Sequence, residues 1–373
     1  MRRHWLDNLR WVTVVLVLIY HVFYFYNNKG VFGGIGGFVD DPMGQPQDVV
    51  MYILYPWFMM LLFLVAGMSA RYSLEKRSAK EFGRSRTLKL LVPSTIGLFV
   101  FHWMVGYFNT RIANPFGEMP LLIKWPLLAI SGCGPLWFIQ DLWLFSILLL
   151  LVRKLDAEDR LWSLCGKAPA PVIILLGLLV WAGSQALIMN PRAESADGLY
   201  NLYKPLTYFI PFLLGYFVFS HDEVQDRVER MHLPVLICAV IAGAALVWTG
   251  WGKDCTNPEY LSGWLNCMYA WLMMLAMLGC FKAWFNRTDA FCSYMTRNSF
   301  GIYIVHYLVV VAVGTMLKEY TCLAPWVIYT VLTAAVLLLS PAIYELLKRI
   351  PFVRWCVLGV VGRSNTPSNK INK

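Results

Sequence analysis

The sequence is built from long apolar runs, each about as long as a bilayer's hydrocarbon core is thick. A helix needs about 20 mostly apolar residues to span that core. Only 14% of the 373 residues are charged, whereas a soluble domain carries roughly 25%, so an ordinary soluble enzyme is excluded. The predicted fold is an all-α polytopic membrane protein with ten transmembrane helices, at residues 9–25, 49–70, 88–108, 135–152, 171–189, 205–219, 233–250, 264–284, 300–317 and 325–347.

The basic residues collect in alternate loops. If the N-terminus lies inside, 25 of the 32 Lys and Arg residues fall in cytoplasmic loops and ends. Cytoplasmic loops carry such an excess, and one missed or invented helix would exchange the sides of every later loop. The pattern therefore predicts cytoplasmic termini and a multi-pass protein of the inner (plasma) membrane. This excess in the cytoplasmic loops also explains the net charge of +10. No nucleic-acid partner is therefore expected.

The domain organisation is simple. We expect a single membrane domain at residues 1–362 and a polar cytoplasmic tail at residues 363–373. The glycine-rich stretch 27–48 reads as an external loop. The apolar stretch 119–130 is half a span long and contains two prolines and a lysine, which favours a segment lying along the outer interface.

The nine cysteines are scattered singly, without a Cys-x-x-Cys motif. No metal site is predicted, because zinc sites require closely spaced Cys and His ligands. Cys255 and Cys267 could form a disulfide in an oxidising outer compartment, and Cys133 and Cys322 are also predicted to be external. The pairing stays open.

Few ionisable residues lie inside the predicted helices, and such residues usually face a cavity or a partner. His21 lies eleven residues beyond Arg10, about 16 Å higher along the first helix. His102 and Asp141 are expected at a similar depth in the outer half of the bilayer. His306 is expected nearer the cytoplasmic half.

These positions suggest an acid–base site. In the functional interpretation His21 is a general base, and Asp141 or Gln140 holds its tautomer and stabilises the imidazolium. The simpler alternative is a histidine satisfied by packing among aromatic rings, which we favour for His102. His306 either faces the path of a donor or bonds a neighbouring helix. The predicted substrate-binding residues are His102, Trp137, Gln140 and His306.

Basic residues also gather at the cytoplasmic end of the third predicted helix. Arg86 and Lys89 are three residues apart and so share one helix face, with Arg84 close by. Two cations near a helix N-terminus suit a phosphate group, which Arg binds bidentately. The sequence thus predicts a site for a phosphate-bearing donor, with Arg10 as a further contact. The alternative is the usual basic excess of a cytoplasmic loop.

Several segments, in order along the chain, resemble the integral-membrane acyltransferase family 3. The stretch LDNLRWVTVVLVLIYH is similar to the family's first helix, in which Arg10, ten further residues and His21 follow one another. FLVAGMSA, with Gly67 and Ser69, resembles the end of the second helix. Arg86-Thr-Leu-Lys89 lies where the family has a paired-arginine motif, with lysine as the second residue. LWF at 136–138 and SFGIYIVH at 299–306 also resemble family segments.

The resemblance implies transfer of an acyl group, acetyl or succinyl, from cytoplasmic acyl-CoA to a hydroxyl of an extracytoplasmic glycan or related acceptor. It implies that His21 is the essential histidine and that the Arg86 motif contacts CoA. The first-helix start and LWF are similar to a branch that succinylates periplasmic glucans. Direct transfer and an acyl-histidine intermediate both stay open, and the oxyanion donor is unassigned among Trp137, Tyr20 and Ser69.

Two other classes of function fit the same polar residues. A transporter or flippase of a glycan or small polar substrate would use them to line a path, without acyl chemistry. If the protein were a purely structural membrane subunit, nothing would explain why it keeps Arg10, His21 and Asp141, which are energetically costly in the bilayer.

Overall fold

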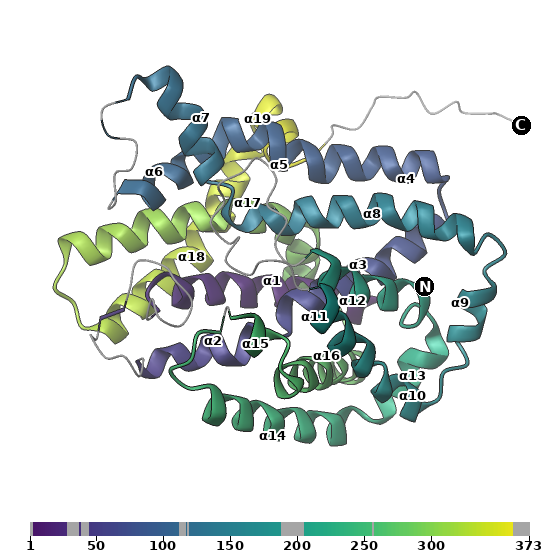
Figure 1. Ribbon diagram of the computed structural model, residues 1–373. Coiled ribbons are helices and arrows are strands. Elements are labelled where there is room, and N and C mark those ends of the chain that lie inside the picture. Colours follow the sequence, from purple (N-terminus) through teal and green to yellow (C-terminus); the bar gives the residue numbers. More distant parts are fainter. Residues whose placement is uncertain are drawn as a thin grey trace, which may run out of the picture.

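The computed structural model describes residues 3–27, 37–38, 45–111, 117, 119–187, 205–255 and 257–360. Every regular element in these ranges is a helix, which confirms the predicted all-α class. Figure 1 shows long helices packed side by side, with short helices around them. The predicted tail at 363–373 and most of the loop at 27–48 lie outside the described residues.

Eight apolar stretches in the described ranges are long enough to cross a bilayer, in agreement with eight of the ten predicted spans. Five are single helices: α1 (His4–Phe25), α14 (His232–Gly250), α16 (Trp264–Trp284), α17 (Ala290–Tyr320) and α18 (Pro325–Leu347). Two others are composite. Pro46–Leu74 joins η1 (Pro46–Asp48), α2 (Val49–Leu54) and α3 (Phe58–Leu74), and Gly134–Leu155 joins η4 (Gly134–Leu136) and α8 (Trp137–Leu155).

The eighth stretch, Ala79–Thr110, changes its winding along its length. It contains two π-helical segments, which are rare and often occur at functional sites. Its parts are α4 (Ala79–Arg86), the π segment η2 (Thr87–Leu91), α5 (Val92–Gly97), the π segment η3 (Leu98–His102) and α6 (Trp103–Arg111).

The other two predicted spans are shorter helices. The stretch 171–189 forms α10 (Ala170–Leu175) and α11 (Gly177–Leu187), and 205–219 forms α12 (Pro205–Phe217). Pro211 lies inside α12, where it removes a backbone donor. The apolar parts of these helices fall below the length of the eight long stretches, so the prediction of full spans is not confirmed here.

The short helix α12 lies directly against α3. A Cβ atom added to Gly67 would lie 1.9 Å from the carbonyl oxygen of Phe212, and one added to Gly215 would lie 2.0 Å from that of Leu64. The two backbones therefore touch in antiparallel register. Gly67, part of the FLVAGMSA segment, is required by packing, since small residues let membrane helices approach closely.

The stretch predicted to lie along the interface forms α7 (Leu121–Ser131). A Cβ at Gly106 would meet the carbonyl oxygen of Leu128 at 1.8 Å, and one at Gly132 would meet that of His102 at 1.9 Å. These contacts pack α7 antiparallel against α6 and η3. Glycine contacts therefore hold the second half of this helix against the bundle, and its place at the outer interface stays a prediction.

Polar side chains join several chain segments at one end of the bundle. The Arg3 guanidinium donates to the Tyr72 hydroxyl (2.8 Å) and to Gln225 Oε1 (2.9 Å), and Arg71 pairs with Asp159 at 2.7 Å. This end includes α9 (Arg160–Cys165) and α13 (Asp222–Arg230). The charge pattern assigns all of these segments to the cytoplasm. Their contacts show that they lie at the same end of the bundle, in agreement with that prediction. Which side of the membrane that end faces stays a prediction.

A second set of contacts lies at the other ends of the same helices. Tyr26 donates to the Gly314 carbonyl oxygen (2.7 Å), and Tyr52 donates to that of Lys253 (3.3 Å). The short helix α15 (Pro258–Leu261) belongs here, whereas α19 (Pro351–Cys356) packs against α5.

All nine cysteines are free thiols. Cys255 Sγ lies 3.5 Å from the Lys253 carbonyl oxygen, whereas Cys267 Sγ lies 3.3 Å from the Ser184 hydroxyl. The suggested disulfide between Cys255 and Cys267 is therefore absent from this structure.

Candidate functional site

The structure brings His21 of α1 and His306 of α17 together. His306 Nε2 lies 3.2 Å from His21 Nδ1, and the ring centroids are 4.9 Å apart. His21 Nδ1 also lies 2.8 Å from the carbonyl oxygen of Val17, one turn earlier in α1. On the far side of the pair, His306 Nδ1 contacts the carbonyl oxygen of Tyr303.

These contacts assign the tautomer of both rings. Carbonyl oxygens only accept hydrogen bonds, so the nitrogen facing each one must carry a proton. His306 is therefore protonated on Nδ1, and its Nε2 presents a lone pair to His21. His21 Nδ1–H is shared between Val17 O and His306 Nε2. The remaining lone pair of the neutral His21 ring is then on Nε2.

Local packing holds both rings in place. The Tyr303 hydroxyl donates to the Pro135 carbonyl oxygen, which ties α17 to the start of α8. Tyr20 and Tyr307 approach the His21 ring edge-on, with centroids 5.3 and 5.1 Å away. His306 is completely buried, whereas His21 is only partly buried. A ligand can therefore reach His21 more readily than His306.

Asp141 and Gln140 do not contribute to this arrangement. Gln140 Nε2 donates to the Ser94 carbonyl oxygen at 3.1 Å, on α5. Asp141 is fully buried, and neither of its carboxylate oxygens has a hydrogen-bond partner among the described residues. The predicted role of either residue in holding the His21 tautomer is therefore wrong: the residues share a depth, but α17 and not α8 lies beside Nδ1.

His102 is 1% exposed, and within the described ranges neither ring nitrogen has a hydrogen-bond partner of good geometry. It lies in η3, within electrostatic range of His306. The structure thus places a third histidine near the pair without a direct contact to His21. Its burial beside the Phe101 ring, with centroids 5.3 Å apart, fits the packed histidine that the sequence favoured, and the substrate contact stays a prediction.

The three candidate oxyanion donors differ in their surroundings. Ser69 donates to the Val65 carbonyl oxygen at 2.9 Å, so its hydroxyl is engaged within α3. Tyr20 is buried, with its ring 4.7 Å from that of Phe58. Trp137 is partly exposed, and its ring lies 5.4 Å from that of Tyr208. Trp137 and Ser69 are both partly exposed, so Tyr20 is the least accessible of the three.

A cationic cluster lies at the opposite end of α1 from His21. The positive charges of Arg10 and Arg77 act on Arg86, and those of Arg77 and Arg86 act on Lys89. Arg10 also pairs with Asp7 at 3.1 Å. Arg86 is half-buried, its guanidinium lies 4.9 Å from the centre of the Phe82 ring, and it has no acidic partner among the described residues. A cluster of like positive charges favours the binding of an anion.

Two details of the predicted phosphate site change. The helix starts at Ala79, where Ser78 and Glu81 form a capping box. Arg86 therefore lies about two turns from the start of the helix. The free backbone amides at the helix N-terminus cannot contact a phosphate bound beside Arg86. Arg84 is exposed and is not among the charges that act on Arg86 or Lys89. Arg77 joins the cluster instead, and its only sequence signal was its place in a basic loop.

Among the described residues, no group of three His, Cys, Asp or Glu side chains could hold a metal ion. The histidine pair offers a neutral imidazole base, and the cationic cluster lies about 16 Å away along α1.

Comparison with known proteins gives one match. The acyltransferase domain family, acyltransferase 3, matches residues 3–345. No curated protein and no solved structure matches the chain. Transport without acyl chemistry, the main alternative from the sequence, is not the activity of this family. With eight membrane-length helices in the described ranges and a match over nearly its whole length, the chain belongs to the acyltransferase 3 family of membrane-embedded, acyl-CoA-dependent O-acyltransferases.

Proposed function

We propose that the protein transfers an acetyl or succinyl group from cytoplasmic acyl-CoA to a hydroxyl of an extracytoplasmic glycan in the inner membrane, with His21 as general base. One observation carries this proposal: Nδ1–H of His21 is engaged by Val17 O and by His306 Nε2. In the opposite tautomer, the Nδ1 lone pair of His21 would face two hydrogen-bond acceptors, Val17 O and His306 Nε2. The basic lone pair is therefore on Nε2, on the partly exposed ring.

The chemistry then follows from that lone pair. His21 Nε2 takes the proton of the acceptor hydroxyl while the hydroxyl oxygen bonds to the thioester carbonyl carbon. The C–S bond breaks, and Nε2–H returns the proton to the departing thiolate. Val17 O and His306 Nε2 stabilise the imidazolium in between, as the partner of a catalytic histidine does in other acyl-transfer enzymes. Attack by Nε2 itself, giving an acyl-histidine, would use the same lone pair.

The cationic cluster supports the donor side of the proposal. Arg10, Arg77, Arg86 and Lys89 would face the phosphate groups of CoA, which supply the negative charge that Arg86 lacks among the described residues. Arg10 and His21 lie on one helix about 16 Å apart. We infer that the acyl-bearing arm of the donor extends along α1 between them.

The remaining candidates take different roles. His306 and Gln140 are fully buried, so neither contacts a substrate directly, and His306 acts as a positioning residue for His21. Trp137, partly exposed at the start of α8, is the substrate-binding residue that we retain. His102 and Asp141 are kept out of the reaction steps, because neither contacts His21.

The test compares His21→Asn with His232→Asn in full-length protein. Asparagine can still donate to Val17 O, but it has no basic nitrogen. His232 also contacts a backbone carbonyl, that of Glu229, but it lies on α14. We expect His21→Asn to lower turnover of acetyl-CoA and succinyl-CoA by roughly 10²- to 10⁴-fold with unchanged donor Kd, and His232→Asn to behave as wild type. Turnover by His21→Asn close to that of wild type would remove His21 from the reaction.

A further inference from the structure

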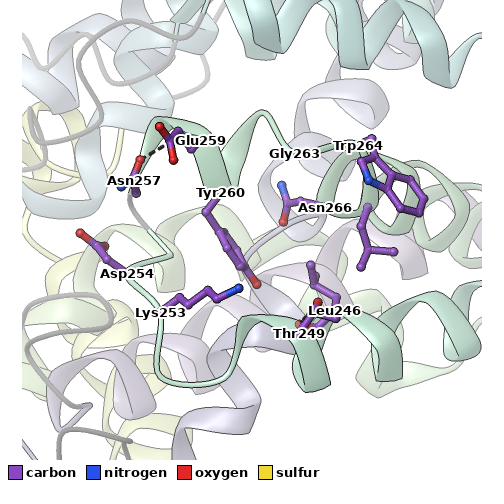
Figure 2. Close-up of a pocket in the computed structure, with 11 residues that line it drawn as sticks. Leu246, Thr249, Lys253, Asp254, Asn257, Glu259, Tyr260, Gly263, Trp264 and Asn266 are labelled. Atoms are coloured by element: carbon purple, nitrogen blue, oxygen red, sulfur yellow. Dashed lines mark hydrogen bonds between the residues drawn. The ribbon is translucent and has the colours of Figure 1, made fainter.

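A cavity of about 600 Å³ opens at the end of the bundle that the sequence predicts to be extracytoplasmic. It lies between the end of α14, the following loop, α15 and the start of α16 (Figure 2). The Tyr52 hydroxyl of α2 donates to the Lys253 carbonyl oxygen beside it, and α2 packs against α1. The cavity is therefore at the same end of the bundle as the outer part of α1, which carries His21.

One buried polar atom in this cavity has no partner. Asn266 is 3% exposed, and its Nδ2 donates to the Leu261 carbonyl oxygen at 3.0 Å. Its Oδ1 has no hydrogen-bond partner in the part of the chain that the structure describes. A buried acceptor left unpaired destabilises the protein. A ligand that supplies an O–H or N–H donor would remove this cost.

The Tyr260 hydroxyl is a second unsatisfied group in the lining. It is buried and has no hydrogen-bond partner of good geometry within the described ranges, although the Cys255 thiol, a weak partner, lies near it. Burial raises the pKa of Tyr260 well above its usual range, so the hydroxyl keeps its proton and can donate. In Figure 2 the Tyr260 ring crosses the cavity between Lys253 and Asn266. The cavity thus offers both an acceptor and a donor.

The rest of the lining suits a neutral, hydroxyl-rich ligand. Trp264 is 65% exposed and gives the rim a flat indole face, which can stack on the C–H face of a sugar ring. The charged side chains are one basic, Lys253, and two acidic, Asp254 and Glu259. This balance does not favour an anion such as a phosphate. Pockets that bind small polar ligands combine a few placed polar groups with aromatic walls in this way.

We propose that this cavity is a subsite for a neutral sugar chain, which holds a glycan at a position beyond the hydroxyl that is acylated. The inference rests on the proposed function, because it identifies the acceptor as an extended glycan. Asn266 Oδ1 accepts from a sugar hydroxyl, the Tyr260 hydroxyl donates to a sugar oxygen, and Trp264 stacks on a ring face.

The experiment uses full-length protein in detergent and three neutral probes: maltohexaose, cellohexaose and laminarihexaose. Binding is measured by ligand-observed NMR for wild type, Trp264→Ala and Asn266→Leu. Trp248→Ala is the matched control, because Trp248 is 87% exposed on α14 and does not line the cavity. We expect wild type to bind at least one hexasaccharide and each cavity variant to weaken that binding about 5- to 10-fold. Trp248→Ala should bind as wild type does.

Measurements with the acyl-CoA donor distinguish the sugar subsite from the proposed acyltransferase function. Each cavity variant should keep the wild-type Kd for acetyl-CoA, which also shows that the protein is folded, while KM for the bound hexasaccharide as acceptor rises. Absence of binding of all three hexasaccharides by a wild type that still cleaves acyl-CoA would overturn the subsite and leave the proposed function intact. Absence of acyl-CoA cleavage would count against the proposed function itself. A phospholipid that copurifies with wild type and is lost from Trp264→Ala would overturn the subsite in favour of a lipid headgroup.

Discussion

His306 Nε2 lies 3.2 Å from His21 Nδ1, although 285 residues separate the two histidines along the chain. The other partner of the same nitrogen is the Val17 carbonyl oxygen, four residues away. One local and one distant acceptor therefore orient the ring. Because His306 is fully buried, it acts through His21 and not on the substrate.

Replacing His306 tests this positioning role. In His306→Ala, Nδ1–H of His21 loses one acceptor, and we expect kcat to fall about 5- to 10-fold with an unchanged KM for acyl-CoA. His306→Gln places an amide oxygen near the former Nε2 and should restore most of kcat. Steady-state kinetics that separate kcat from KM check both. Equal losses in the two variants would assign His306 a packing role instead.

Arg86 is expected to contribute to donor binding. Removing its guanidinium should raise KM for acyl-CoA about 10-fold or more, because charge-assisted hydrogen bonds are the stronger ones, and the effect should shrink at high ionic strength. Lys89→Ala should act in the same direction. Arg84→Ala is the control, because Arg84 is exposed and outside the cluster. A rise in KM for Arg84→Ala as large as that for Arg86→Ala would indicate general surface attraction and no specific site.

The Asp141→Asn variant tests whether Asp141 is a catalytic carboxylate or a buried polar side chain with no role in the reaction. The Asp141 oxygens have no hydrogen-bond partner among the residues that the structure describes, and the His21 contacts are complete without them. We expect acyl transfer by Asp141→Asn to stay within about 3-fold of wild type, well short of the roughly 10²-fold that loss of an acid–base group costs. A loss of that larger size would return Asp141 to the catalytic group.

Gly67→Ala should destabilise the protein. The new Cβ would lie 1.9 Å from the Phe212 carbonyl oxygen, so α3 and α12 must separate. Gly83→Ala is the matched control, since its Cβ would meet only Leu150 Cδ1, at 3.6 Å. Alanine inside a helix is favoured over glycine by roughly 0.5–1 kcal/mol. Thermal unfolding in detergent should therefore show a lower Tm for Gly67→Ala and an unchanged or higher Tm for Gly83→Ala. A wild-type Tm for Gly67→Ala would mean that the helices do not touch there.

The pair between Arg71 and Asp159 gives a pH-dependent contribution to stability. The Arg71 guanidinium, 2.7 and 3.1 Å from the two carboxylate oxygens, lowers the pKa of Asp159 below its usual range. The stabilisation is therefore present above the ordinary Asp pKa of about 3.9 and is lost as the pH falls through the lower folded pKa.

Asp159→Asn tests that dependence. Asparagine tolerates the left-handed backbone at this position, where φ is 55°. We expect the variant to have a lower Tm than wild type at pH 7, and the two Tm values to converge below pH 3 or so. A constant difference across the whole pH range would show that the carboxylate charge is not the cause.

Several features could be read from the sequence because they depend on local composition. The length of an apolar run determines whether a helix can cross a bilayer, and eight predicted spans are confirmed in the described ranges. An internal proline alone does not decide the length: α12, which contains Pro211, is one of the shorter spans, whereas α18 contains Pro341 and is long enough to cross a bilayer. The spacing of Arg10 and His21 on one helix likewise needs no tertiary information.

Only the tertiary structure decided which side chains meet. Depth along a helix places His21, His102 and Asp141 in one layer, but it does not say which helices are neighbours or which way each helix is rotated. Those choices come from packing contacts between distant segments, such as Tyr303 with Pro135 and Gly67 with Phe212. They placed His306 beside His21 and left the Asp141 carboxylate without a hydrogen-bond partner among the described residues. The reason is that side-chain proximity in a helix bundle depends on helix rotation and neighbour order, which no single apolar run encodes.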